Sequence, residues 1–203
     1  MKIRPILFST PMVEAIVDKR KTQTRRFQGL KKINIEPDRY IINKVIGGFL
    51  VDDLHTLEDF EINSKYEVGD ILWVRESWDY SDDLEEPYLY RQKELDELKP
   101  EFFKRMKWKP SIHMHKETCR LFLECTSVRV ERLREISPSD AIQEGVKLDK
   151  GLKNLNSKMI NSVIKFRELW EKINGKDSWE SNPWVWVYYF KLTERPTNFL
   201  NNE

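Results

Sequence analysis

The apolar positions near the two ends of the chain predict β-strands. The run from Ile3 to Phe8 is short and largely apolar, and the segment from Trp184 to Leu192 alternates with a period of two residues. One face of this second segment carries only aromatic side chains: Trp184, Trp186, Tyr188 and Phe190. Aromatic side chains on one face of a strand are typical of a packed interior.

Further strands are predicted in the middle of the chain. The apolar run Ile71–Val74 follows a turn over Glu67–Asp70. Arg120–Leu133 has a long strand pattern whose inward face changes near Thr126, which indicates a bulge or bend. The glycine pair Gly47-Gly48 between short apolar runs predicts a hairpin.

Three helices are indicated by their start signals and their spacing. Thr10 as N-cap, followed by proline, predicts a helix over about Pro11–Lys19. Ser137 as N-cap and a terminating glycine delimit a short helix over Pro138–Glu144. A third helix is predicted from about Ser157 to Asn174, where apolar residues are spaced by three and four.

This order of elements favours an α+β fold over a doubly wound parallel sheet, because few strands alternate strictly with helices. We expect a small mixed β-barrel flanked by helices, formed as one domain over residues 1–195 and followed by a tail at 196–203. Residues 27–65 and 79–117 are expected to be insertions, the second with some helix near residues 94–106.

The composition is that of a soluble globular protein, with 34% charged and 39% apolar residues. No apolar run approaches the ~20 residues that a membrane-spanning helix needs. Because there is no signal-peptide core and only two cysteines, we expect a cytoplasmic protein without a disulfide framework. The net charge is only +1, so any contact with nucleic acid is expected to be local rather than along a duplex.

The segment Lys19–Arg26 is the most informative stretch of the chain, because five of its eight residues are cationic. Positive charges packed this closely repel one another, and an anionic or electron-rich ligand would offset the repulsion. The structural alternative is a solvated helix end whose cations interact favourably with the helix dipole.

Three short sequence motifs occur in a fixed order along the chain. Lys21, Thr24 and Arg26 follow the predicted first helix with the spacing Lys-x-x-Thr-x-Arg, Gly69-Asp70 precedes an apolar strand, and Ala141–Gly145 has the form Ala-x-x-Glu-Gly. In this order they resemble the landmarks of the ASCH family, a branch of the PUA-like β-barrels, with Lys19 in the place of the signature's glycine. The chain also resembles the longer ASCH-like proteins often carried by phages and prophages.

The resemblance implies binding of a nucleic acid or a nucleoside in a cleft of the barrel. Some compact ASCH-like proteins are amidohydrolases that release cytidine and a carboxylate from N4-acylated cytidines, and the resemblance places their catalytic roles on Lys21, Thr24 and Glu144. A non-catalytic RNA or modified-base binding module and a ribonuclease remain open as alternatives.

The residue types themselves also indicate amide hydrolysis. Lys21 is crowded by four cations and is expected to have a lowered pKa, so that its neutral amine could take a proton from the Thr24 hydroxyl. Arg26 would hold the developing oxyanion or a phosphate, and Glu144 would protonate the leaving amine or orient water. In the structural alternative, Thr24 caps a helix end and Glu144 is a surface residue.

Other residues are predicted to bind the ligand. The expected binding residues are Arg20, Arg25, Arg26, Trp73, Glu76 and Trp78. The tryptophans would stack a base, although core packing is the commoner role of such residues, and Glu76 is a rival to Glu144 as the site carboxylate. The expected partner is a nucleoside, a nucleotide or single-stranded RNA or DNA.

No membrane partner, cofactor or metal is expected. The histidines and cysteines that would invite a zinc site do not have the paired spacing of known sites: His113, His115, Cys119 and Cys125.

Overall fold

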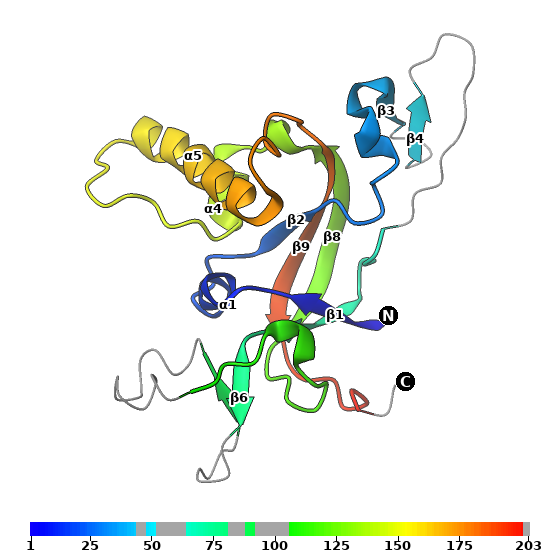
Figure 1. Ribbon diagram of the computed structural model, residues 1–203, viewed down its shortest axis with the longest axis vertical. Coiled ribbons are helices and arrows are strands. Elements are labelled where there is room, and N and C mark those ends of the chain that lie inside the picture. Colours follow the sequence, from blue (N-terminus) through cyan, green and yellow to red (C-terminus); the bar gives the residue numbers. More distant parts are fainter. Residues whose placement is uncertain (44–47, 52–63, 81–87, 92–105, 201–203) are drawn as a thin grey trace. The chain divides into compact units, whose positions relative to one another are not determined.

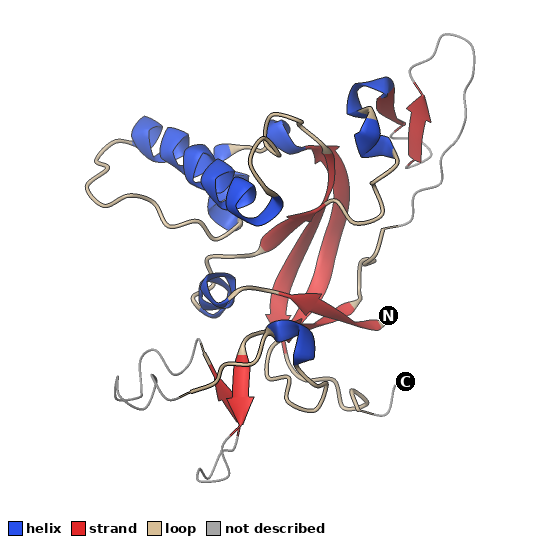
Figure 2. Ribbon diagram, viewed as in Figure 1, coloured by secondary structure: helices blue, strands red, loops and turns tan. Residues whose placement is uncertain are grey.

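A five-stranded mixed sheet organises the chain, with the strand order β1-β5-β8-β9-β2. Its strands are β1 (Ile3–Leu7), β2 (Gln23–Arg26), β5 (Ile71–Arg75), β8 (Phe122–Arg132) and β9 (Trp184–Thr193). β1 pairs in parallel with β5, whereas β5 pairs antiparallel with β8 and β2 pairs antiparallel with β9. The predicted α+β class with flanking helices is confirmed (Figures 1 and 2), and where a small mixed barrel was expected the described residues form this mixed sheet.

The computed structural model describes residues 1–43, 48–51, 64–80, 88–91 and 106–200. Within these, β3 (Tyr40–Asn43) pairs antiparallel with β4 (Gly48–Val51). A hairpin was predicted here with its turn at Gly47-Gly48, but Gly48 is a strand residue opposite Asn43, and residues 44–47 lie outside the described residues. A second ribbon joins β6 (Trp78–Tyr80) to β7 (Tyr88–Tyr90). The helix predicted near residues 94–106 falls almost entirely outside the described residues.

The chain divides into two compact units, which are described separately. The first unit comprises residues 1–22, 68–126 and 190–203, and the second comprises residues 23–67 and 127–189. Strands β8 and β9 pass from one unit to the other.

The first unit contains helix α1 (Thr10–Val17) and the 3-10 helix η3 (Ser111–His113). The predicted N-cap at Thr10 is wrong: Thr10 is the first helical residue, and Ser9, with an extended backbone, is the N-cap. Pro11 lies in the first turn, where its missing N–H costs nothing. A core cluster of this unit lies beside β5 and β8 and is formed by Ile71, Trp78, Met114, Cys119, Phe122 and Phe199.

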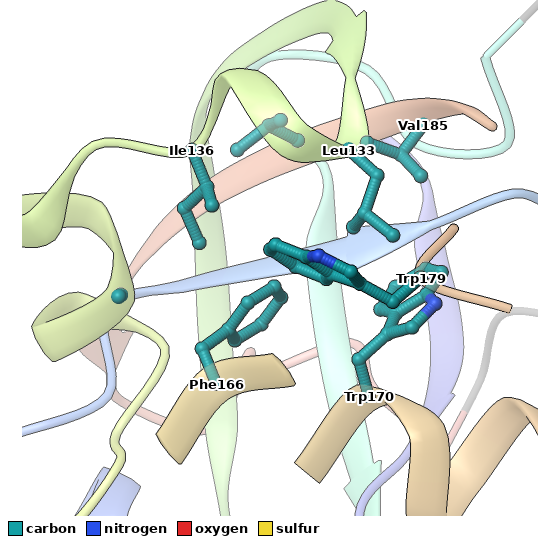
Figure 3. Close-up of a cluster of buried hydrophobic side chains, with 8 residues drawn as sticks. Leu133, Ile136, Phe166, Trp170, Trp179 and Val185 are labelled. Carbon is teal, nitrogen blue, oxygen red and sulfur yellow. The ribbon is translucent and has the colours of Figure 1, made fainter. Parts of the chain in front are cut away.

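The second unit packs helices α4 (Pro138–Gln143) and α5 (Leu155–Asn174) beside β9, together with the 3-10 helices η1 (Ile33–Ile35), η2 (Pro37–Arg39) and η4 (Leu133–Glu135). The cap prediction for α4 is confirmed, because the Ser137 side chain accepts a hydrogen bond from the amide of Asp140 at 3.0 Å. Figure 3 shows the core, in which Phe166 and Trp170 of α5 lie close to Trp179 and Leu133. Val185 and Val187 complete this cluster from β9.

Candidate functional site

The basic segment does not continue the first helix. Helix α1 ends at Val17, and the amides of Arg20 and Lys21 then donate to the carbonyl of Ala15 at 2.8 Å each, which closes a tight turn. Lys19 occupies this turn with a φ of 59°. The remainder of the segment, from Gln23 to Arg26, is strand β2, which the sequence did not predict.

The first unit contains the part of the basic segment from Lys19 to Thr22. Lys21 is the most deeply buried cation in this part. Its side chain is 2% exposed, and its Nζ lies 5.6 Å from the centroid of the Phe8 ring. Phe8 in turn contacts Phe190, with 6.0 Å between ring centroids. A lysine ammonium therefore sits against an aromatic surface, where a cation over a ring face is favourable.

Lys21 lines a pocket of about 370 Å³ that lies wholly in the first unit. The lining residues come from the end of α1, from the turn after it and from β8 and β9: Ile16, Lys19, Lys21, Thr22, Leu123, Phe190, Lys191 and Leu192. Three of the eight are lysines, and the others, apart from Thr22, are apolar. A mostly apolar pocket of a few hundred Å³ with a few polar groups is the usual form of a small-molecule site.

Arg20 of the basic segment and Lys191 of the pocket each have a carboxylate partner. Arg20 donates to Oδ2 of Asp18 from Nε at 3.2 Å and from Nη2 at 2.9 Å, at the protein surface. Lys191, a pocket residue, lies 3.1 Å from a carboxylate oxygen of Glu124. The predicted mutual repulsion is therefore reduced at Arg20 without a ligand.

Arg25 belongs to the second unit and is enclosed by carboxylates. Its guanidinium, with no exposed surface, donates to Glu131 at 2.6 and 2.9 Å, to Glu144 at 3.0 Å and to Asp140 at 3.3 Å. Its positive charge is matched by these carboxylates within the unit. A role of Arg25 in ligand binding stays a prediction. Its guanidinium also lies 5.7 Å from the ring centroid of Phe166.

A second arginine extends this network. Arg129 donates to Glu131 at 2.8 Å and to Asp140 at 2.9 Å, and it also contacts the Tyr189 hydroxyl. Burial opposes the ionisation of Asp140, but Arg25 and Arg129 outweigh it and hold its pKa below the ordinary value. The network joins β2, β8 and β9 to α4 through hydrogen bonds between charged groups.

Thr24 and Arg26 lie on β2 opposite Tyr188 and Trp186 of β9, respectively. Thr24 is buried, at 2% exposure, which removes the alternative of an exposed helix cap. Burial lowers the pKa of Arg26, and the nearby Glu144 acts in the opposite direction. Glu144 is the C-cap residue of α4 and is buried, at 4% exposure, so it is not the surface residue of the structural alternative.

Glu76 and Arg120 form a separate pair in the first unit. Glu76, 1% exposed, accepts two hydrogen bonds of 2.9 Å from Nε and Nη2 of Arg120, whose guanidinium lies 4.3 Å from the ring centroid of Tyr90. Burial raises the pKa of Glu76, and Arg120 opposes that rise. With both carboxylate oxygens engaged by one guanidinium, Glu76 is better explained as a buried structural partner than as a site carboxylate.

The two predicted stacking tryptophans are packed to different extents. Trp78 is 5% exposed and belongs to the core, with Nζ of Lys109 at 4.6 Å from its ring centroid, so it is a core residue rather than a stacking platform. Trp73 is half-buried, and its ring contacts Phe199 at 6.1 Å and the Arg75 guanidinium at 5.5 Å.

The candidate residues fall into separate groups. Lys21 lies in the first unit with the pocket, whereas Thr24, Arg25, Arg26 and Glu144 lie in the second. Within the second unit, Arg25 and Glu144 are in direct contact, and Glu144 acts electrostatically on Arg26.

Sequence reasoning missed Lys191, Glu131 and Arg129. The alternation Val128-Arg129-Val130-Glu131 was a usable signal, because it places Arg129 and Glu131 on one face of a strand.

Among the residues that the structure describes, no group of three or more His, Cys, Asp and Glu side chains is arranged to hold a metal ion. Cys119 and Cys125 are both buried, and neither is in a disulfide. In the same part of the chain, no helix has the length and apolar character needed to cross a membrane.

Comparison with known proteins finds structural similarity but no sequence match. No family model and no curated protein matches the chain. An ASCH domain structure from Lactobacillus crispatus JV V101 is similar over 96% of this chain and 81% of its own, at 12% identity and a TM-score of 0.38. Protein EF3133 from Enterococcus faecalis V583, of family DUF984, is similar over 96% of this chain and 77% of its own, at 10% identity and a TM-score of 0.39.

Proposed function

We propose that the chain binds a nucleotide or a nucleoside, and that the lysine-lined pocket of the first unit is the binding site. The observation that carries the proposal is the placement of Lys21, a buried cation of the basic segment, in the lining of a largely apolar pocket of about 370 Å³ with two further lysines. A nucleotide has the matching chemistry, since it joins a flat, weakly polar base to a hydrophilic and often anionic part.

The apolar lining suits the base. Phe190 supplies an aromatic surface, and Ile16, Leu123 and Leu192 supply aliphatic contacts. Base stacking on one aromatic ring contributes about 1–3 kcal/mol and tolerates different bases. The lysine side chains suit the polar part of the ligand, because each ammonium has three donors for phosphate, ribose or carbonyl oxygens.

Calorimetric titration with cytidine and with cytidine 5′-monophosphate tests this proposal. The wild-type protein should bind one ligand per chain, and Lys21→Met should weaken binding by at least about tenfold, equivalent to about 1.4 kcal/mol. Lys158→Met is the matched control, because Lys158 is an exposed lysine of α5 in the other unit. The proposal fails if neither ligand binds, or if both variants bind like the wild type.

A second candidate function is hydrolysis of the exocyclic amide of an N4-acylcytidine. The burial of Lys21 favours it, because a lysine held in an apolar pocket beside other cations is the setting in which enzymes use the amine as a base or nucleophile. In this hypothesis the Lys21 amine is the base that activates water for attack on the amide carbonyl, so that the C–N bond breaks and cytidine and a carboxylate are released.

Turnover of N4-acetylcytidine decides between binding and catalysis. An amidohydrolase should release cytidine and acetate, and Lys21→Met should lower kcat by about a hundredfold or more. A binding protein should give no release in any form. An RNA-binding module would instead bind oligonucleotides, with an affinity that falls steeply with salt concentration.

A further inference from the structure

Lys19 occupies a backbone conformation that favours glycine. Its φ of 59° is in the left-handed region, which residues with a Cβ atom adopt only at a cost. The turn itself is held by main-chain hydrogen bonds, including the one of 3.0 Å from the Lys19 amide to the carbonyl of Ile16. These main-chain bonds do not depend on the side chain, so the turn does not explain why a lysine stands there.

The Lys19 side chain lines the same pocket as Lys21 and Lys191. Lys19 is exposed and the Lys191 side chain is 62% exposed, whereas Lys21 is 2% exposed. The pocket therefore has one lysine in its interior and two on its solvent side. Strained residues that persist in a structure are concentrated at ligand sites, where the side chain has a purpose that offsets the strain.

The pocket lining favours a ligand with negative charge over a neutral one. Its eight residues include three lysines and no carboxylate, and the carboxylate of Glu124 reaches Lys191 from outside the lining. A phosphate monoester carries a charge of about −1.5 to −2 at neutral pH and presents three acceptor oxygens. Lysine ammoniums are effective partners for such a group, because each acts as a compact, mobile point charge.

We propose that the pocket takes a phosphorylated ligand, a nucleoside monophosphate rather than a nucleoside, and that Lys19 and Lys191 select it through the phosphate. This inference rests on the proposed function, since it names the class of ligand for the same pocket. Lys19 is then a specificity-determining residue that is kept in a glycine-favouring conformation because its ammonium is needed at the solvent side of the pocket.

The test compares cytidine 5′-monophosphate, cytidine and inorganic phosphate by calorimetry on the wild-type protein and on Lys19→Gly, Lys191→Met and Lys158→Met. The wild type should bind the monophosphate at least about tenfold more tightly than cytidine, and the difference should shrink as salt rises. Lys19→Gly and Lys191→Met should each weaken monophosphate binding by about fivefold and weaken cytidine binding less, so that the preference for the monophosphate shrinks. Inorganic phosphate should compete with the monophosphate.

Thermal unfolding of Lys19→Gly separates a ligand role from a structural one. Because glycine relieves the unfavourable φ, the melting temperature should stay the same or rise by about 2–4 °C, while monophosphate affinity falls. A fall in melting temperature together with unchanged affinity would overturn the role of Lys19.

The possible failures are distinguishable. If cytidine and the monophosphate bind equally, the phosphate inference is wrong while the proposed function stands. If neither binds, both are wrong.

Discussion

Nη1 of Arg25 lies 3.0 Å from Oε1 of Glu144, and the two residues are 119 positions apart in the chain. The contact joins strand β2 to the C-terminal end of helix α4, and Glu131 and Asp140 bind the same guanidinium. Two residues first considered for ligand binding and catalysis are thus partners in a buried network. Arg25 stabilises the second unit, and any catalytic use of Glu144 has to operate beside a permanent positive charge.

Replacing Arg25 should destabilise the protein strongly. Arg25→Met removes the buried cation that three carboxylates surround, while Arg129 still pairs with Glu131 and Asp140. Breaking a buried ion pair costs about 3–5 kcal/mol. Urea unfolding measures the change. Arg20→Met is the matched control, because its partner Asp18 is exposed and surface pairs contribute at most about 1 kcal/mol. Equal effects of the two substitutions would contradict the assignment.

Acid should weaken the fold through Asp140. Its pKa in the folded protein is lowered below the ordinary value of 3.8, so the unfolded chain binds more protons under acidic conditions. The stability contributed by Asp140 is therefore fully present above that value and is lost as the pH falls through the folded-state pKa. The difference in unfolding free energy between wild type and Asp140→Asn should be largest near neutral pH and should shrink below about pH 4. A difference that is constant down to about pH 2 would rule this out.

Elements with local signals were predictable from the sequence. The cap at Ser137 and the glycine stop at Gly145, which has a φ of 89°, fixed α4 to within one residue, because both act on the backbone beside them. The spacing of apolar residues placed α5 to within two residues of its start. Thr10 was mistaken for the cap of α1 because Ser9, another N-cap residue type, precedes it.

Elements that depend on distant partners were not predictable in this way. Strand β2 is made of Gln, Thr, Arg and Arg, which have no apolar alternation, and it is a strand because it pairs with β9 more than 150 residues later. The same limit applies to the charged residues, since Glu131 and Asp140 reach Arg25 across 106 and 115 positions. Lys191 could not be assigned to the pocket from the sequence for the same reason, because it lies near the other end of the chain from Lys19 and Lys21.

Both cysteines should be unreactive in the folded protein. Cys119 and Cys125 are buried, and burial raises the pKa of Cys119 to about 12, so its thiol stays protonated near neutral pH. Ellman's reagent should detect no thiol in native protein and two in guanidinium chloride. Thr126→Cys provides a positive control at an exposed position, where one thiol should react quickly. Rapid labelling of the native wild type would contradict this burial.

The Glu76–Arg120 pair should show strong coupling. Arg120→Met leaves the buried Glu76 without its cation and should cost about 2–4 kcal/mol, somewhat less than a fully buried pair because Arg120 is 23% exposed. Burial already raises the pKa of Glu76, so the loss should become smaller as the pH is lowered, because a protonated Glu76 needs no cation.

A double-mutant cycle checks this coupling. Adding Glu76→Gln to Arg120→Met should recover part of the lost stability, because a neutral amide is easier to bury than a carboxylate. Strictly additive effects of the two substitutions would show that the pair is not coupled.

The most direct test of the nucleotide pocket is a methyl NMR titration with cytidine 5′-monophosphate. Saturable shifts are expected at the methyl groups of three pocket residues, Ile16, Leu123 and Leu192, and none at those of Leu133 and Val185 in the core of the second unit. Lys21→Met should abolish the shifts. Shifts confined to other residues, or no shift at millimolar ligand, would contradict the claim that this pocket binds a nucleotide.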